Sequence, residues 1–301
     1  MIFISGYVSA VGSLSGLAIG DAMGAPFEGH PRLSTGALRM LQYGTFLQNQ
    51  AHFTDDTLQA IAVAESLIQC RGYSPEDLIG RLITGYRRFP QYYGPTSRGA
   101  FEAVIAGAPP DRAASQVRGG RSGSRSNGSV MRGPPVGIFF RGEKVREVSV
   151  RCSYLTHDHP VAAECSAWVN QMVSDLCRGF SKTGAFSRAL HRCDDEEVIR
   201  VLGGYHQYAI VPGLDALEAT HAALSVFMES HTFHDAITRA IRLGGDTDTV
   251  AAIAGALAGA WTGYRGIPES WRTRIPGIEE VTSVGCLLWS VSQSTRQGFP
   301  G

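Results

Sequence analysis

The hydrophobic pattern of the chain is helical along most of its length, and this limits what it can fold into. Apolar residues recur at spacings of three and four, the period of an amphipathic helix. Alternating strand patterns are scarce, and the run from Val136 to Phe140 fits either a short strand or the start of a buried helix. No repeat of fixed period is present. Helices are expected over residues 7–22, 56–70, 161–178, 214–230, 232–243, 248–263 and 281–293.

A long segment from about Phe89 to Pro135 interrupts these helices. It is rich in Gly, Pro, Ser and Arg, with one helix expected near residues 96–106. At 301 residues, the chain has room for one large domain or for two joined by such a linker. Because similar apolar helices lie on both sides of it, we interpret the segment as a functional loop within a single domain covering residues 1–301.

Composition and charge exclude several classes of protein. With 44% apolar and 18% charged residues, the chain does not have the profile of a disordered protein. Its 27 basic and 27 acidic residues cancel, so no net field attracts it to nucleic acid or to an anionic membrane. The first basic residue is Arg32, which leaves no basic start for a signal peptide, and we see no strongly apolar stretch that suggests a membrane span. We therefore expect a cytoplasmic protein with neither a membrane nor a nucleic-acid partner.

The cysteines and the common catalytic motifs narrow the chemistry further. The six cysteines form no CxxC pair, which argues against a zinc knuckle and favours free thiols in a reducing compartment. The chain has no Walker A sequence, no GxGxxG, no GxSxG elbow and no HExxH. A function must therefore come from other residues.

Two clusters of Asp and Thr each stand directly before a predicted helix. They are Phe53–Thr57 (FTDDT) and Gly244–Thr249 (GGDTDT), and glycines in the second allow positive φ and close backbone approach. Asp and Thr at a helix start usually cap free N–H groups, but capping does not require so many carboxylates. Neighbouring carboxylates repel unless they share a proton or a cation, and hard oxygen ligands suit Mg²⁺, Mn²⁺ or Ca²⁺. We interpret the clusters as halves of one site with enough carboxylates for two ions.

Two further segments are ambiguous on their own. Gly20–Glu28 (GDAMGAPFE) fits a helix stop followed by an exposed Glu. Thr156–Pro160 (THDHP) leads into a helix, where Asp158 is a candidate N-cap. Because the other candidate ligands are hard oxygens, we interpret its histidines as hydrogen-bonding groups.

The segment Asn127–Arg132 (NGSVMR) lies in a basic part of the chain. From Arg112 to Arg141 there are six Arg and no Asp or Glu. Backbone N–H groups before a helix can bind a phosphate, and a solvated loop is the alternative interpretation. Arg132 could also pair with a buried carboxylate.

These five segments, in this order, resemble the ADP-ribosylglycohydrolase family of the dinitrogenase-reductase-activating type. The last of them extends through Ala260 (GGDTDTVAAIAGALAGA), and the similarity covers about residues 10–290. The resemblance implies an all-α, single-domain helical bundle with two Mg²⁺ or Mn²⁺ ions in a cleft. One departure is Ser126, where the family commonly has Gly before the Asn.

The resemblance also implies roles for individual residues. The metal ligands would be Thr54, Asp55, Asp56, Asp246, Asp248 and Thr249. Glu28 would lie in a loop that reaches the metals and closes over substrate, and it joins Asp55, Asp56 and Asp248 as the catalytic candidates. The substrate-binding residues would be Asn127, Gly128, Ser129, Met131 and His157, with Tyr208 as a candidate for stacking on adenine.

The activity implied by the resemblance is hydrolysis of an ADP-ribosyl group, with an arginine N-glycosidic linkage on a protein favoured over other linkages. A water bound to a metal would attack the anomeric carbon. The substrate would be an ADP-ribosylated protein or a small ADP-ribosyl compound, and the working expectation is a monomer. The alternatives are a protein that binds ADP-ribose and blocks a partner with little hydrolysis, or a two-metal phosphoesterase.

Overall fold

The computed structural model describes residues 2–34, 36, 51–117 and 125–297. Its α-helices are α1 (Ile2–Gly24), α4 (Asp55–Cys70), α5 (Pro75–Arg88), α6 (Pro95–Ile105), α7 (Pro110–Val117), α8 (Gly128–Met131), α9 (Pro134–Phe139), α10 (Glu143–Tyr154), α11 (Pro160–Leu176), α12 (Lys182–His191), α13 (Glu196–Gly203), α14 (Ala216–Glu229), α15 (Phe233–Arg242), α16 (Thr247–Thr262), α17 (Glu269–Arg274) and α18 (Ile278–Gln297). Four 3₁₀ turns join them: η1 (Ala25–Phe27), η3 (Pro90–Tyr92), η5 (Tyr205–Gln207) and η6 (Tyr264–Gly266).

The all-α prediction is confirmed. The described residues form no strand, and their only extended pairing is an isolated bridge between Ser126 and Asp215. The run 136–140 belongs almost wholly to helix α9, so of the two alternatives, a short strand or a buried helix, the helix is correct. The punctuated segment 89–135 holds more helix than the single one expected, because α6 is followed by α7 and the short α8.

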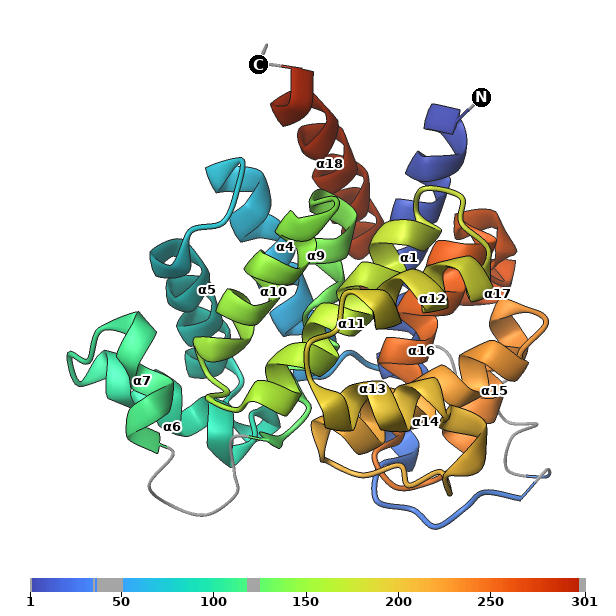
Figure 1. Cartoon of the computed structure of the whole chain (residues 1–301), viewed down its shortest axis with the longest axis horizontal. Coiled ribbons are helices and arrows are strands. Elements are labelled where there is room, and N and C mark those ends of the chain that lie inside the picture. The colour runs from blue at the N-terminus through green and yellow to red at the C-terminus, as the bar shows by residue number, and fades with distance from the viewer. Residues whose placement is uncertain (1, 35, 37–50, 118–124, 298–301) are drawn as a thin grey trace.

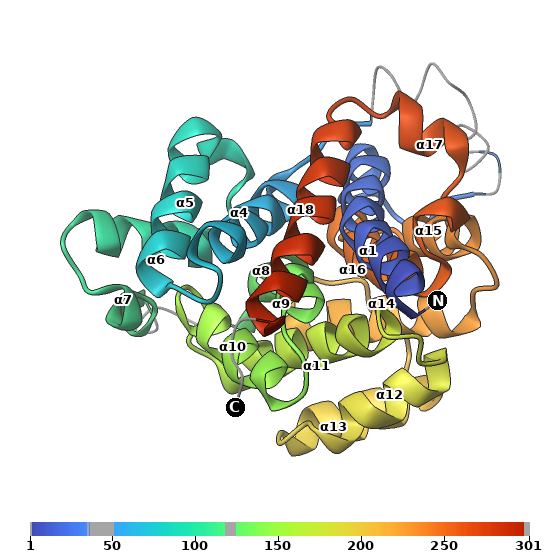
Figure 2. The same ribbon diagram turned by 90° about the horizontal axis from the view of Figure 1, so that it is seen from above.

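Helices α1 and α16 run antiparallel at the centre of the molecule (Figures 1 and 2). Glycines in both helices remove the side chains that would hold the backbones apart. A β-carbon on Gly16 would collide with the carbonyl oxygen of Gly255, and one on Gly20 with that of Ala251. The small-residue face inferred for α16 is thus a packing surface. Because the helices are antiparallel, the end of α1 meets the start of α16.

Helix α1 is the one described helix long and apolar enough to cross a membrane by length and composition, over Gly6–Phe27. However, 83% of the most apolar part is buried within the fold. Other helices pack around it, among them α15, α16 and α18 (Figure 2). The apolar character of α1 is therefore explained by its place in the core.

The buried face of helix α4 is not the face that the spacing of its apolar residues predicts. The row Leu58, Ile61, Glu65 and Ile68 is only partly buried, and Glu65 is exposed and pairs with Arg81 of α5. The buried positions of the helix are mostly small or polar: Asp56, Thr57, Gln59, Ala60, Ala62, Val63, Ala64, Ser66 and Leu67. The buried part of α4 thus carries the polar groups of the site together with small side chains, Val63 and Leu67.

Candidate active site

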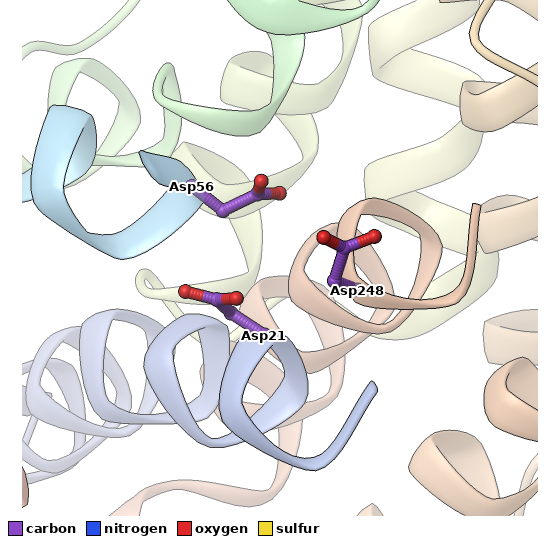
Figure 3. A group of neighbouring side chains, drawn as sticks. All are labelled: Asp21, Asp56 and Asp248. Carbon is purple, nitrogen blue, oxygen red and sulfur yellow. The ribbon is translucent and has the colours of Figure 1, made fainter. Parts of the chain in front are cut away.

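Three buried carboxylates from three helices lie around one space (Figure 3). Asp21 is near the end of α1, Asp56 in the first turn of α4 and Asp248 in the first turn of α16. One oxygen of each lies within 4.8 Å of the others. The close α1–α16 packing brings Asp21 beside Asp248, and α4 adds Asp56.

A second group of carboxylates shares Asp248 with the first. Glu28, Asp246 and Asp248 also have oxygens within 4.8 Å of one another. Positive φ angles of 76° at Gly244 and 68° at Gly245 shape the turn that carries Asp246, as the glycines in this motif suggested. The exposed Glu28 is held near this turn because the neighbouring Gly29 N–H donates to the Gly245 carbonyl at 2.8 Å.

The capping interpretation of the two Asp–Thr clusters is wrong. Thr54 and Asp246 occupy the N-cap positions of α4 and α16, yet neither side chain caps its helix within the described chain. By contrast, Asp195 and Asp215 accept two N–H bonds each as N-caps of α13 and α14. The side chains of Thr54 and Asp246 instead face the site.

Burial and mutual repulsion raise the pKa of five carboxyls at the site, those of Asp21, Glu28, Asp55, Asp56 and Asp246. Desolvation is the main cause for Asp21, whose pKa rises to about 6, and for Asp55, whose pKa rises to about 8. It also raises the pKa values of Asp56 and Asp246 well above the ordinary range. At Glu28 the charge of Asp248 is the larger cause, followed by burial. Without a cation the cluster therefore favours bound protons.

The donor set fits a divalent cation. In the described part of the chain, Oδ1 of Asp56 and Oδ1 of Asp248 are buried without a hydrogen-bond partner. A buried charged oxygen without a partner is costly, and a hard cation is the partner that carboxylates accept most readily. Thr249 lies beside these carboxylates, and its Oγ1 donates to Asp56 Oδ2 at 3.4 Å. The residues present thus suit Mg²⁺ or Mn²⁺.

Asp21 is a residue of this site that the sequence analysis did not single out. Its carboxylate accepts from the N–H of Thr54 at 2.9 Å, from Thr54 Oγ1 at 2.7 Å, and from both N–H and Oγ1 of Thr57. It thereby fixes the start of α4 against α1. A signal was available, because Asp21 is the only charged residue of the apolar helix α1.

Asp55 stands apart from the two carboxylate groups. It belongs to neither set of oxygens within 4.8 Å, although its pKa responds to the charges of Asp21 and Asp248. Its Oδ2 accepts from Gln59 Nε2 at 2.7 Å. The position is therefore beside the cluster, with one carboxylate oxygen held by Gln59.

The segment 127–131 lies directly against the carboxylates. Asn127 Nδ2 donates to Asp246 Oδ2 at 2.5 Å, and Thr249 Oγ1 lies 3.9 Å from Met131 Sδ. Ser129 Oγ accepts from Ser153 Oγ at 2.8 Å, so a residue of helix α10 holds this side chain. The structure thus brings the predicted loop and the predicted metal cluster into one site.

His157 lies beneath this loop. It is 1% exposed, Nδ1 is 2.7 Å from Thr156 Oγ1 and Nε2 is 3.1 Å from Ser126 Oγ. Its predicted contact with substrate stays a prediction, because both ring nitrogens already have partners in the chain. The N-cap of the following helix is His159, whose Nδ1 accepts from the Val161 N–H, so the assignment of that role to Asp158 was wrong.

Tyr208 lines a neighbouring cavity of about 280 Å³ together with Arg125, Val211 and Asp215. The residue is 41% exposed, and its ring meets His221 edge-on. The loop after Tyr208 is joined to the site, since the Asn127 N–H donates to the Leu214 carbonyl at 3.0 Å. The stacking of Tyr208 on adenine stays a prediction.

The model of the ADP-ribosylglycohydrolase family matches residues 7–297. The chain belongs to this family. ADP-ribosylarginine hydrolase Tri1 of Serratia proteamaculans is 29% identical, with 91% of this chain and 77% of that protein covered. The ADP-ribosyl-dinitrogen reductase glycohydrolase of Rhodospirillum rubrum is 25% identical, with 88% and 90% covered. A solved ADP-ribosylglycohydrolase-related protein complex superposes with a TM-score of 0.82 at 28% identity, over 96% of this chain and 99% of that one.

As an ADP-ribosylglycohydrolase, the chain is an enzyme that removes ADP-ribose from modified substrates. The described Arg residues between 112 and 141 have different surroundings: Arg125 pairs with Glu197 and Asp215, whereas Arg132 is buried. Arg118 and Arg121 lie outside the described residues.

Proposed function

We propose that this ADP-ribosylglycohydrolase cleaves the N-glycosidic bond between ADP-ribose and arginine on modified proteins, using two Mg²⁺ or Mn²⁺ ions. The observation that carries the metal part is the pair of buried, unpartnered carboxylate oxygens on Asp56 and Asp248. The arginine linkage is favoured by two relatives of 29% identity, both named ADP-ribosylarginine hydrolases.

The chain's own residues divide the work. Asp56, Asp246 and Asp248, with Glu28 and Thr249, would hold the ions, which when bound would supply an activated water and fix the ribose hydroxyls. Asp55 is the candidate proton acceptor, because it lies beside the cluster and Gln59 holds one of its carboxylate oxygens. Segment 127–131 would bind the diphosphate, with N–H groups at the start of α8.

The reaction develops positive charge on the ribose as the anomeric bond breaks. The ions held by the carboxylates would bind the ribose hydroxyls, and the diphosphate contacts would hold the sugar in place. Asn127 couples these two parts, because the same residue begins the loop and donates to Asp246.

The test is release of ADP-ribose from an arginine-modified protein and from a serine-modified peptide, each with Mg²⁺, with Mn²⁺ and with chelator. We expect cation-dependent release from the arginine substrate. Release only from the serine substrate would overturn the linkage, and full activity in chelator would overturn the metal requirement. Binding of ADP-ribose without any release would support the rival function of a blocking protein.

The first predicted variant in this assay is Asp248→Ala. Asp248 belongs to both carboxylate groups, so its loss should lower kcat at least about 100-fold while the helical circular dichroism spectrum is kept. Glu65→Ala, which removes an exposed carboxylate on α4 away from the cluster, is the matched control and should retain activity. Equal activity of the two variants would remove Asp248 from the mechanism.

We further propose that the enzyme works as a monomer in the cytoplasm. All six cysteines are free, which suits a reducing compartment. Size-exclusion chromatography with light scattering and fractionation of the source cells test the two parts of this proposal.

A further inference from the structure

We propose that Arg132 is a positioning residue that holds both halves of the site, through one buried hydrogen-bond relay running from Asp55 to Ser126. Its guanidinium lies between the α4 carboxylates and the loop that precedes α8. The inference rests on the proposed function for what the two halves bind, whereas the relay itself rests on contacts within the chain.

The first arm of the relay leads to Asp55. Arg132 NH1 donates to Gln59 Oε1 at 2.9 Å, and Gln59 Nε2 donates to Asp55 Oδ2 at 2.7 Å. Because an arginine only donates, it fixes which end of the Gln59 amide faces the guanidinium. The NH2 end of the Gln59 amide must then face Asp55, so the Asp55 carboxylate is held in one orientation.

The second arm leads to the loop. Arg132 NH2 donates to Thr156 Oγ1 at 2.6 Å, which leaves the Thr156 hydroxyl proton for His157 Nδ1 at 2.7 Å. At the other end, Ser126 Oγ donates to Thr96 at 3.3 Å and therefore accepts from His157 Nε2 at 3.1 Å. Both ends require the same tautomer, with the proton on Nε2.

His157 transmits this order to the loop by direct contact. A β-carbon on Gly128 would lie 3.0 Å from both Cε1 and Nε2 of the imidazole. The loop backbone therefore lies close to the ring, and a β-carbon on Gly128 would require the imidazole to shift by a few tenths of an ångström. A change in the ring's orientation would move the backbone N–H groups that face the diphosphate.

Burial and charge explain why an arginine is needed. Arg132 is 1% exposed and, among the described residues, makes no ion pair with a carboxylate. Its charge is instead distributed over Gln59, Thr156 and the Cys152 carbonyl, which accepts at 3.1 Å. The expectation that Arg132 pairs directly with a carboxylate is thus wrong, because Gln59 stands between them.

Three substitutions separate the arms. Thr156→Val removes the hydroxyl at nearly constant volume and should weaken ADP-ribose binding about tenfold, with Thr156→Ser restoring it. Gln59→Met should lower kcat about tenfold with little change in ADP-ribose affinity. Arg132→Lys should affect both quantities. Calorimetric titration with ADP-ribose, steady-state kinetics and thermal melting would be measured on each full-length variant.

A direct readout requires no activity. Nitrogen-15 NMR of the imidazoles should show His157 neutral with its proton on Nε2 in the wild type and in Thr156→Ser, and a mixture of tautomers in Thr156→Val. A proton on Nδ1 in the wild type would overturn the relay. So would unchanged ADP-ribose affinity in a folded Thr156→Val protein.

Failure of the relay and failure of the proposed function give different results. If the wild type neither binds nor releases ADP-ribose, the proposed function fails, and the NMR measurement still decides the relay. If the wild type is active but His157 has the other tautomer, the relay fails and the proposed function stands.

Discussion

The aspartates at helix starts in this enzyme have two different roles: some cap the helix, and others face the carboxylate cluster. At the starts of α5, α12, α13, α14 and α15 a Ser, Thr or Asp caps the helix, as Asp195 and Asp215 do. At the starts of α4 and α16 the side chains leave the backbone and face the carboxylate cluster. Neither N-cap side chain caps its own helix, and at α4 the carboxylate of Asp21 accepts from the Thr57 N–H in its place.

Asp56→Asn tests whether the carboxylate cluster destabilises the fold in the absence of a cation. Asp56 is fully buried, and burial together with the charge of Asp248 raises its pKa well above the ordinary range. Removing this carboxyl should raise the melting temperature in chelator by about 2 °C or more, because repulsion within the cluster is relieved. The same variant should lose most of the stabilisation that Mg²⁺ gives the wild type. A lower melting temperature in chelator would contradict the prediction.

The sequence identified most site residues but not those that support them. Thr54, Asp56, Asp246 and Asp248 stand out because each motif combines two Asp with two Thr, more carboxylates than capping of one helix requires. Asp21 was passed over because a helix-stop pattern of Gly and Pro follows it. The relay through Gln59 could not be predicted, because its partners are far apart in the sequence and only the packing of α4 against α8 and α9 brings them together.

The central α1–α16 pair is the element that sets the spacing of the cluster. The helical period predicted both helices well, and the glycines of α16 correctly indicated close packing. Their antiparallel register could not be predicted, because it depends on glycines of α1 that meet those of α16. The orientation of α4 was also missed, since its buried positions are mostly small or polar.

Gly255→Ala tests the role of this contact. A β-carbon there would collide with the carbonyl of Gly16, so the helices must separate. We expect a loss of about 1–3 kcal/mol in unfolding free energy and weaker binding of Mg²⁺, measured by denaturant unfolding and by calorimetry.

The matched control is Gly80→Ala in α5. A β-carbon on Gly80 meets no atom within 4 Å, and alanine favours a helix over glycine by about 1 kcal/mol. This variant should be as stable as the wild type or more stable, with unchanged Mg²⁺ affinity. Similar losses of unfolding free energy and Mg²⁺ affinity in both variants would show that the glycine contact between α1 and α16 has no special role.

At the scale of the whole molecule, the balance of 27 acidic and 27 basic residues conceals a local excess of acid. Five carboxylates gather at the ends of three central helices and the adjoining loop, whereas Arg125, Arg146 and Arg239 are engaged in ion pairs elsewhere. Charge in this enzyme is thus organised by position, and the sequence total carries no information about the site.

This arrangement predicts how pH and Mg²⁺ act together on stability. Carboxyls with raised pKa bind protons more tightly in the folded state than in the unfolded state, so their ionisation destabilises the metal-free fold as pH rises. The loss extends from the ordinary Asp pKa of 3.8 to about 8, the value reached by Asp55. Mg²⁺ must displace these protons at lower pH.

We therefore expect Mg²⁺ to raise the melting temperature more at about pH 8 than at about pH 6. Thermal melts at both pH values, with saturating Mg²⁺ and with chelator, measure this difference. Burial holds the pKa of His157 well below its ordinary 6.5, so this residue lowers the stability of the metal-free fold as pH falls, whereas the carboxyls lower it as pH rises. Subtracting the chelator curve removes that contribution. An Mg²⁺ effect that is equal at both pH values would contradict the prediction.

The glycine contact between α1 and α16 has a consequence for how such an enzyme can diversify. The separation between Asp21 and Asp248 is set by two helix backbones in direct contact, far from the surface. Exposed loops, such as the one after Tyr208 with Val211 and Leu214, attach at the rim of this arrangement. Evolution can therefore exchange the surface that selects a target while the reactive centre is inherited unchanged.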